Sequence, residues 1–331
     1  MIRILLLSTG GTIASRPGRD GLEPGMSGEE LIESLGDLRG KFEITVKQIM
    51  NLDSSNIQAE EWKVMAKAVH ENYDAYDGFV ITHGTDTMAY SASALSFMLE
   101  NLNKPVVFTG AQIPLCELRS DGRDNIINSV VIAASDEIHE VCLYFNGKLL
   151  RGNRSTKASS DQFKAFVSPN APLLADVGIT IQYNHQAIRP SCRGVFRLQE
   201  FAEIPIGVLK IFPGIQFGLF ESIMTEKLKG VVLETFGSGN IPSSENSLLP
   251  IIEKAYESGT IIVVCSQCMQ GTVSLGAYAT SKALRDVDAV NGRDMTTEAA
   301  VTKLYYLFSR GLNKEEIKQY MAQNLCGELT D

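Results

Sequence analysis

Histidine is scarce in this sequence, and its four residues do not have the spacing of metal ligands. They are His70, His83, His139 and His185. No Gly-x-Ser-x-Gly turn accompanies them, which argues against a Ser-His-Asp hydrolase. The chain also lacks the G-x-x-x-x-G-K-[ST] phosphate loop, and its near-match to G-x-G-x-x-G at residues 237–239 continues with Asn240-Ile241-Pro242. We therefore expect no metal and no nucleotide or other organic cofactor.

The sequence also lacks an excess of basic residues, long apolar runs and paired cysteines. Its 30 Lys and Arg against 39 Asp and Glu give a net charge of -9, which disfavours a nucleic-acid surface. No segment has the unbroken apolar length of a membrane span. Only Arg3 precedes the first short apolar run, so we expect no signal peptide. Four cysteines are isolated and Cys265-x-x-Cys268 stands alone, which favours reduced thiols and a cytoplasmic protein.

What the 331 residues do contain is an alternation of apolar strands and helices. This alternation predicts an α/β protein with mainly parallel, Rossmann-like or flavodoxin-like sheets. A segment with two prolines and no clear period divides it, so we expect a larger domain at 1–188, a linker at 189–206 and a smaller domain at 207–331. The expected strands are 2–7, 42–49, 78–82, 105–109, 141–145, 207–211, 230–235 and 260–266. The expected helices are 27–35, 59–72, 88–99, 121–134, 248–258, 296–309 and one capped by Asn313 with Glu316, while 15–28 and 146–189 are expected to be mostly loop.

The most informative stretch is LLLSTGGTIA at Leu5 to Ala14, where a buried strand runs into a Gly-Gly turn. Two glycines allow a sharp turn and a close approach to a ligand. Thr12 is then expected at the carboxyl end of the first strand, the edge where open α/β sheets bind ligands. The alternative is that Thr12 only caps a following helix.

A second strand ends in a similar way, in His83-Gly84-Thr85-Asp86-Thr87. A hydroxyl nucleophile needs a proton acceptor, and where histidine is missing a lysine can serve. Lys157 lies in a Gly/Ser/Thr-rich segment and is a candidate for this role. The competing interpretations are that Asp86 and Thr87 cap the next helix and that Lys157 is a solvated surface charge.

Four long motifs decide between these interpretations. They are TGGTIA at 9–14, HGTDTMAYSASALSFMLENL at 83–102, TGAQIPLCELRSDGRDN at 109–125 and RGNRSTKA at 151–158. Together with SQCMQG at 266–271 and the C-terminal QNLCGELT, they resemble the L-asparaginase family in its cytosolic, type I branch. The resemblance covers essentially the whole chain.

This resemblance implies an amidohydrolase that converts L-asparagine to L-aspartate and ammonia. It makes Thr12 the nucleophile, and Thr85, Asp86 and Lys157 a second catalytic set. The substrate's α-carboxylate is expected at the loop of Asp53, Ser54 and Ser55, and its α-ammonium at Asp86. Ala111 is expected to line the substrate site. The resemblance also implies a homodimer or a dimer of dimers in which Asn240 reaches into the partner's site, and weak action on L-glutamine is possible.

Two positions depart from the family pattern. The family places a tyrosine in the loop beside the nucleophile, but here Leu22 stands at that position and residues 13–28 contain no tyrosine. Either another tyrosine substitutes, or Lys157 acts through Thr85 or a water, or activity is low. Glu234 stands where some type I members have an arginine at a second asparagine site, and a carboxylate would repel that ligand's own carboxylate. Two other functions stay open: an asparagine sensor without turnover, and the asparaginase-like subunit of a tRNA amidotransferase.

Overall fold

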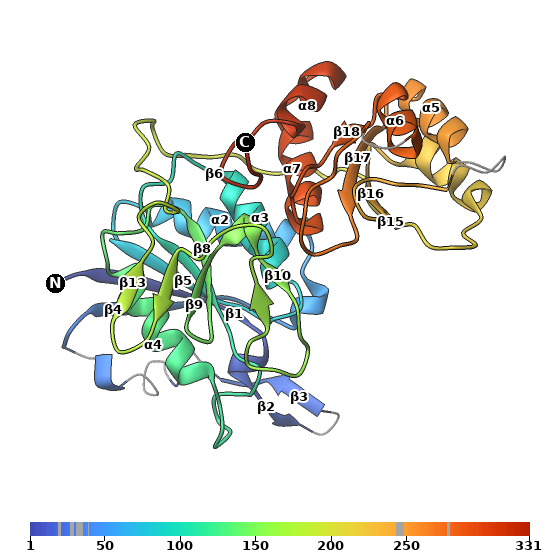
Figure 1. Ribbon diagram of the computed structural model, residues 1–331. Coiled ribbons are helices and arrows are strands. Elements are labelled where there is room, and N and C mark those ends of the chain that lie inside the picture. The colour runs from blue at the N-terminus through green and yellow to red at the C-terminus, as the bar shows by residue number, and fades with distance from the viewer. Residues whose placement is uncertain (19–20, 27–29, 31–35, 39, 243–247, 277–278) are drawn as a thin grey trace. The chain divides into compact units, whose positions relative to one another are not determined.

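The computed structural model describes residues 1–331 apart from 19–20, 27–29, 31–35, 39, 243–247 and 277–278 (Figure 1). The chain forms two compact units, Met1–Gln199 and Glu200–Asp331. The boundary between the units falls inside the segment 189–206, where the sequence predicts a linker. Both units are α/β, and the first is the larger, as the sequence predicts.

The first unit is built on an eight-stranded sheet in the order β13-β12-β9-β8-β7-β5-β1-β4. The strands from β4 to β8 in this order are parallel, and β9, β12 and β13 extend the sheet in antiparallel fashion. All five strands predicted for this part of the chain are confirmed. The bounds are β1 (Arg3–Gly10), β4 (Glu43–Leu52), β5 (Gly78–Thr82), β7 (Val106–Thr109), β8 (Val141–Phe145), β9 (Lys148–Arg151), β12 (Ala175–Val177) and β13 (Ile181–Tyr183).

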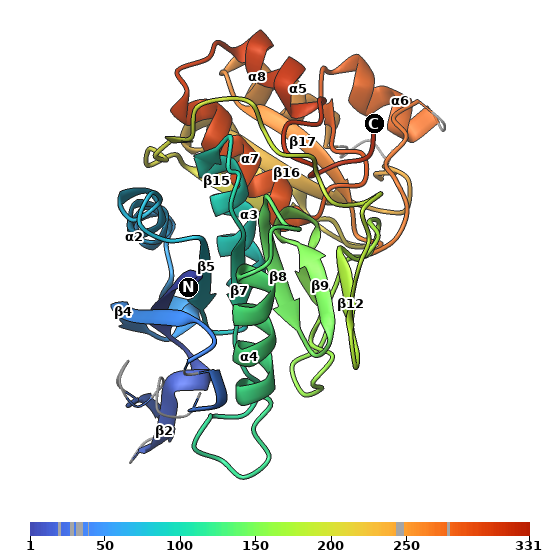
Figure 2. The same cartoon turned by 90° about the vertical axis from the view of Figure 1, so that its left-hand side faces the viewer.

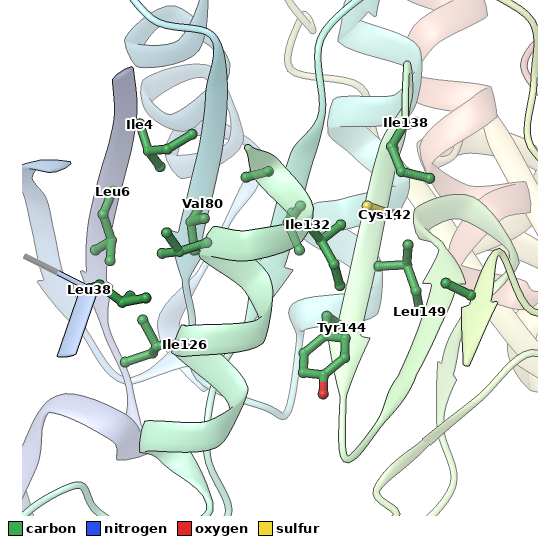
Figure 3. Packing of buried hydrophobic residues seen from close by; sticks show 14 of the residues in the cluster. Ile4, Leu6, Leu38, Val80, Ile126, Ile132, Ile138, Cys142, Tyr144 and Leu149 are labelled. Carbon is green, nitrogen blue, oxygen red and sulfur yellow. The ribbon is translucent and has the colours of Figure 1, made fainter. Parts of the chain in front are cut away.

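Among the described residues, three helices flank this sheet: α2 (Ala59–Glu71), α3 (Met88–Met98) and α4 (Gly122–Ala133) (Figure 2). Successive strand residues point to opposite faces, so the even-numbered residues Ile4 and Leu6 of β1 share a face with Val80 of β5. Helix α4 covers that face with Ile126 and its apolar neighbours (Figure 3). Strand β1 is buried on both faces, which explains why its sequence contains a continuous apolar run.

The segment after β1 differs from the expectation. Residues 15–28 were expected to form a loop, but Ser15–Gly18 (β2) and Gly21–Pro24 (β3) pair as an antiparallel hairpin. The two strands are rich in Gly and Pro and have no alternation of apolar residues, so the sequence pattern does not predict this hairpin. Leu22 lies on β3 opposite Pro17. The helix expected at 27–35 lies, apart from Glu30, outside the described residues.

The expectation of loop for 146–189 was also only partly right. This stretch contains β9, β12, β13 and a small hairpin of β10 (Thr156–Lys157) with β11 (Phe166–Val167). Farther on, Arg197–Leu198 (β14) pairs with Leu99–Glu100 (β6), so part of the expected linker packs on the first unit. Two- and three-residue strands are too short to show a period in the sequence. The short helical turns of this unit are Thr12–Ala14, Gly36–Leu38, Ser54–Asn56 and Gly152–Arg154.

The second unit has a four-stranded parallel sheet in the order β15-β16-β17-β18. Its predicted strands and helices are confirmed, including the cap of α7 by Thr296 and the capping box of α8 by Asn313 and Glu316. The strands are β15 (Ile206–Lys210), β16 (Gly230–Thr235), β17 (Ile261–Ser266) and β18 (Val290–Asn291). The helices are α5 (Leu249–Glu257), α6 (Ala279–Asp286), α7 (Thr297–Ser309) and α8 (Lys314–Met321), with helical turns at Phe217–Phe220 and Ile223–Lys227. Helix α6 and strand β18 were not expected from the sequence.

A fully buried ion pair ties the C-terminal residues to this unit. Lys303 Nζ on α7 lies 2.5 Å from Glu328 Oε1, and both side chains are inaccessible to solvent. Burial raises the pKa of Glu328, but Lys303 and the N–H groups of Cys326 and Leu325 outweigh it and hold that pKa below its usual value. Glu328 is therefore ionised, and its removal would leave Lys303 buried without its counter-charge.

Candidate active site

Three turns meet at the carboxyl edge of the larger sheet, and glycines allow them to touch. A Cβ atom on Gly11 would lie 2.3 Å from Gly84 N, and one on Gly84 would lie 2.6 Å from Ser54 Oγ. Neither space can hold a side chain, so the turns after β1 and β5 touch through their backbones and Gly84 packs directly against Ser54 of the turn after β4. This contact brings the Thr12, Ser54 and Thr85 segments together, as expected for the carboxyl ends of parallel strands.

Thr12 follows Gly11 directly and begins the helical turn Thr12–Ala14. Gly11, with φ 77°, occupies the cap position, and no side-chain hydrogen bond caps this turn. The alternative that Thr12 is a helix cap is therefore wrong. Ser15 Oγ donates to Gly11 O at 2.9 Å, and Thr12 is half-buried. Thr12 is thus held on a fixed turn and is partly accessible to solvent.

Lys157, Thr85 and Asp86 are in direct contact. Lys157 Nζ donates to Thr85 Oγ1 at 2.8 Å and to Asp86 Oδ1 at 2.7 Å. The Lys157 side chain is 19% exposed and that of Asp86 64% exposed. Lys157 is therefore not a freely solvated surface charge, while Asp86 remains accessible to a ligand.

Hydrogen bonds also decide the capping alternative for Asp86 and Thr87. Thr87 occupies the cap position of α3, but its side chain does not cap the helix. Thr87 Oγ1 instead donates to Ser54 O at 2.7 Å, which ties the β5 turn to the β4 turn.

Asp53, Ser54 and Ser55 form a closed turn after β4. Asp53 Oδ1 accepts from Ser55 N at 2.8 Å and from Ser55 Oγ at 2.7 Å. These two hydrogen bonds lower the pKa of Asp53. Ser54 is buried, whereas Asp53 and Ser55 are exposed. Asp53 thus fixes the orientation of Ser55.

Gln112 and Asp121 belong to the same edge and were missed by the sequence analysis. Ala111 is buried after β7, and Gln112 Oε1 accepts from Thr85 Oγ1 at 3.4 Å. Asp121 accepts from the N–H groups of Gln112 and Ile113 at 3.0 and 3.1 Å. The signal was available, since Gln112 is the first polar residue after the fourth predicted strand. Its position alone did not reveal the contact with Thr85.

Asn240 and Glu234 lie in the second unit. Asn240 closes a turn with Phe236 after β16. Glu234 Oε1 accepts from Thr297 Oγ1 at 2.6 Å, and Glu234 Oε2 lies 4.0 Å from Lys210 Nζ. The structure leaves the expected roles of both residues as predictions.

Within the described ranges, no group of histidine, cysteine, aspartate and glutamate is arranged to hold a metal ion. No helix among these residues has both the length and the apolar character needed to cross a bilayer.

Comparisons with known proteins identify the family and the fold. Residues 3–189 match the model "Asparaginase, N-terminal" and residues 205–321 match "Glutaminase/Asparaginase C-terminal domain". The chain is 47% identical over 279 residues to L-asparaginase 1 of Escherichia coli, covering 84% of this chain and 82% of the relative. The structure of L-asparaginase I from Vibrio cholerae matches with a TM-score of 0.91 and 42% identity over 99% of both chains. The L-asparaginase structure from Thermococcus kodakarensis matches with a TM-score of 0.93 and 32% identity over all of both chains. The chain therefore belongs to the asparaginase family.

Proposed function

We propose that this enzyme hydrolyses L-asparagine to L-aspartate and ammonia. The observation that carries the proposal is the contact of Lys157 Nζ with both Thr85 Oγ1 and Asp86 Oδ1, beside the turn that presents Thr12. A lysine, a hydroxyl and an accessible carboxylate at one sheet edge suit a small zwitterionic substrate. Family membership supplies the reaction class.

In the proposed reaction Thr12 is the nucleophile. Its hydroxyl oxygen attacks the side-chain amide carbon, and its proton passes through Thr85, directly or through a water, to Lys157, which takes part as the neutral amine and accepts the proton on the Nζ lone pair. Backbone N–H groups at the ends of β1 and β5 stabilise the oxyanion. The proton then goes to the departing nitrogen, which leaves as ammonia and creates a β-aspartyl ester on Thr12. Water hydrolyses the ester and releases aspartate.

The remaining residues hold the substrate. The exposed carboxylate of Asp86 binds the α-ammonium, and Asp86 also keeps Lys157 beside Thr85. The loop of Asp53, Ser54 and Ser55 holds the α-carboxylate, with the Ser54 hydroxyl as a donor, because the N–H and hydroxyl of Ser55 already donate to Asp53 Oδ1. Asp53 itself carries a negative charge, so it serves this carboxylate indirectly, by fixing Ser55. Ala111 and Gln112 line the side next to Thr85.

The proposal extends to the assembly and location of the protein. We expect a homodimer or a dimer of dimers in which Asn240 completes the partner's site, as the family resemblance implies. We also expect a cytoplasmic enzyme, for which the six free cysteines are the support. L-Glutamine is expected to be at most a weak substrate.

Ammonia release from the purified protein and L-asparagine tests the function. We expect stoichiometric aspartate and ammonia from the wild type and none above background from Thr12→Ala. Binding of asparagine without ammonia would instead identify a sensor. The subunit of a tRNA amidotransferase is the less favoured alternative, because this chain carries a net charge of -9.

A further inference from the structure

We infer that His83 is a positioning residue that holds the Gly84–Thr85 peptide in the orientation the reaction needs. The inference rests on the proposed function. It adds a residue that contacts neither the substrate nor the nucleophile but lies directly behind the Thr85 turn.

His83 follows β5 and is completely buried. Its ring makes an edge contact with Phe108 of β7, with ring centroids 5.9 Å apart. Burial lowers the pKa of His83 to about 4. At neutral pH the imidazole is therefore uncharged, with one nitrogen that donates a hydrogen bond and one that accepts.

The hydrogen-bond partners of the His83 ring show which of its two nitrogens carries the proton. His83 Nδ1 lies 2.7 Å from Gly84 O, and a carbonyl oxygen can only accept, so Nδ1 is the donor. His83 Nε2 lies 2.9 Å from Ser91 Oγ on α3. Nε2 is then the acceptor, so the Ser91 hydroxyl donates to it while the Ser91 oxygen accepts from Trp62 Nε1 on α2 at 3.1 Å. The Gly84 end sets the tautomer, and the Ser91 end is compatible with it.

The hydrogen bond from His83 to Gly84 O fixes the direction of the peptide group between Gly84 and Thr85. In a trans peptide the C=O and N–H groups point in opposite directions. Because His83 draws the Gly84 carbonyl inward, the Thr85 N–H points away from His83. In the part of the chain that the structure describes, Thr85 N–H donates to no protein group. It is thus held ready to donate to the substrate oxyanion beside the Thr85 hydroxyl.

Alternative anchors for this peptide are weak. Gly84 has no side chain, and its contacts with Gly11 and Ser54 limit its position without fixing the direction of its carbonyl. The His83 hydrogen bond supplies that direction, and α2 and α3 brace it from behind through Trp62 and Ser91.

The matched variants His83→Asn and His83→Leu test the inference. Both remove the distal part of the ring and have nearly the same branched shape, but only Asn keeps a nitrogen donor one bond from Cγ, where Nδ1 stands. We expect His83→Asn to keep kcat within about threefold of the wild type. We expect His83→Leu to lose about tenfold to hundredfold in kcat, with KM changed by less than about threefold, because a misdirected oxyanion donor acts in the transition state. Equal losses of kcat in the two variants would overturn the inference.

A second measurement on the wild type needs neither activity nor a folded variant. Imidazole ¹⁵N NMR between pH 5 and 8 should show His83 as the neutral tautomer protonated at Nδ1. A proton on Nε2, or titration of the ring in this range, would contradict the assignment. If the wild type released no ammonia, the proposed function would fail, while the NMR result would still decide the His83–Gly84 bond.

Discussion

At the residue scale, the Thr85 hydroxyl contacts Lys157, and the turn of Thr85 packs against the Thr12 turn through Gly84 and Gly11. Thr85 is 6% exposed, and its Oγ1 accepts from Lys157 at 2.8 Å. Valine has nearly the same shape but cannot relay a proton. We expect Thr85→Val to lower kcat by about 10³-fold or more, the loss typical of a disrupted proton-transfer set. Steady-state ammonia assays measure this, and circular dichroism checks the fold.

The matched control is Thr87→Val, two residues along, which removes the bond to Ser54 O but no group in the proton path. It should reduce kcat far less than Thr85→Val. Similar losses in both variants would mean that rigidity of the turn matters and the Thr85 proton path does not.

His83 also predicts a pH dependence of stability. Its folded-state pKa of about 4 lies below the unfolded value of 6.5. Between these values the unfolded chain binds the extra proton, so the free energy of unfolding falls as pH decreases. We expect a loss of about 2 kcal/mol between pH 7 and pH 5 from this group. Urea denaturation at both pH values measures it, and in His83→Asn the loss should disappear. A wild type and variant with the same pH slope would exclude His83 as its source.

At the element scale, the β2–β3 hairpin carries Leu22, one of the two positions at which the resemblance implies a departure from the family pattern. Leu22 lies on β3, at the position where the resemblance implies a tyrosine. A leucine cannot accept or relay a proton, so the hairpin can only shape the site and exclude water. We expect Leu22→Tyr to raise kcat by about tenfold to hundredfold, the lower range for a positioned proton-transfer group.

Leu22→Phe is the control for this variant, because it adds the ring without the hydroxyl. It should gain little in the same kcat assay. Equal gains would assign the effect to ring packing, and no gain from either would mean that another group already serves as the base.

The sequence predicts the long elements well and the short ones poorly. Strands such as Gly78–Thr82 are continuous apolar runs between turn residues, and α8 carries a complete capping box, so local chemistry defines both. The β2–β3 hairpin and β14 depend on backbone pairing with a distant or Gly-rich partner, which leaves no period. The contacts of Gln112 with Thr85 and of Lys303 with Glu328 join residues far apart in the chain, and a sequence pattern does not show such pairs.

At the scale of the whole molecule, the buried Lys303–Glu328 pair anchors the C-terminal residues to the second unit. Removing one partner of a buried pair leaves an uncompensated charge. We expect Glu328→Gln to destabilise the second unit by about 3–5 kcal/mol. Differential scanning calorimetry should show its transition at lower temperature.

The matched control is Glu315→Gln. Glu315 is an exposed glutamate on α8 that also pairs with a lysine, so its substitution should shift the transition little. An equal shift in the two variants would show that burial of the Lys303–Glu328 pair is unimportant.

The central claim is that Thr12 forms a covalent ester with the substrate, and rapid quenching with acid tests it most directly. Wild-type protein mixed with excess L-asparagine, quenched during turnover, digested and analysed by mass spectrometry should show one β-aspartyl group on Thr12. The adduct should be absent from Thr12→Ala. An adduct on another residue, or full turnover by Thr12→Ala, would contradict the account.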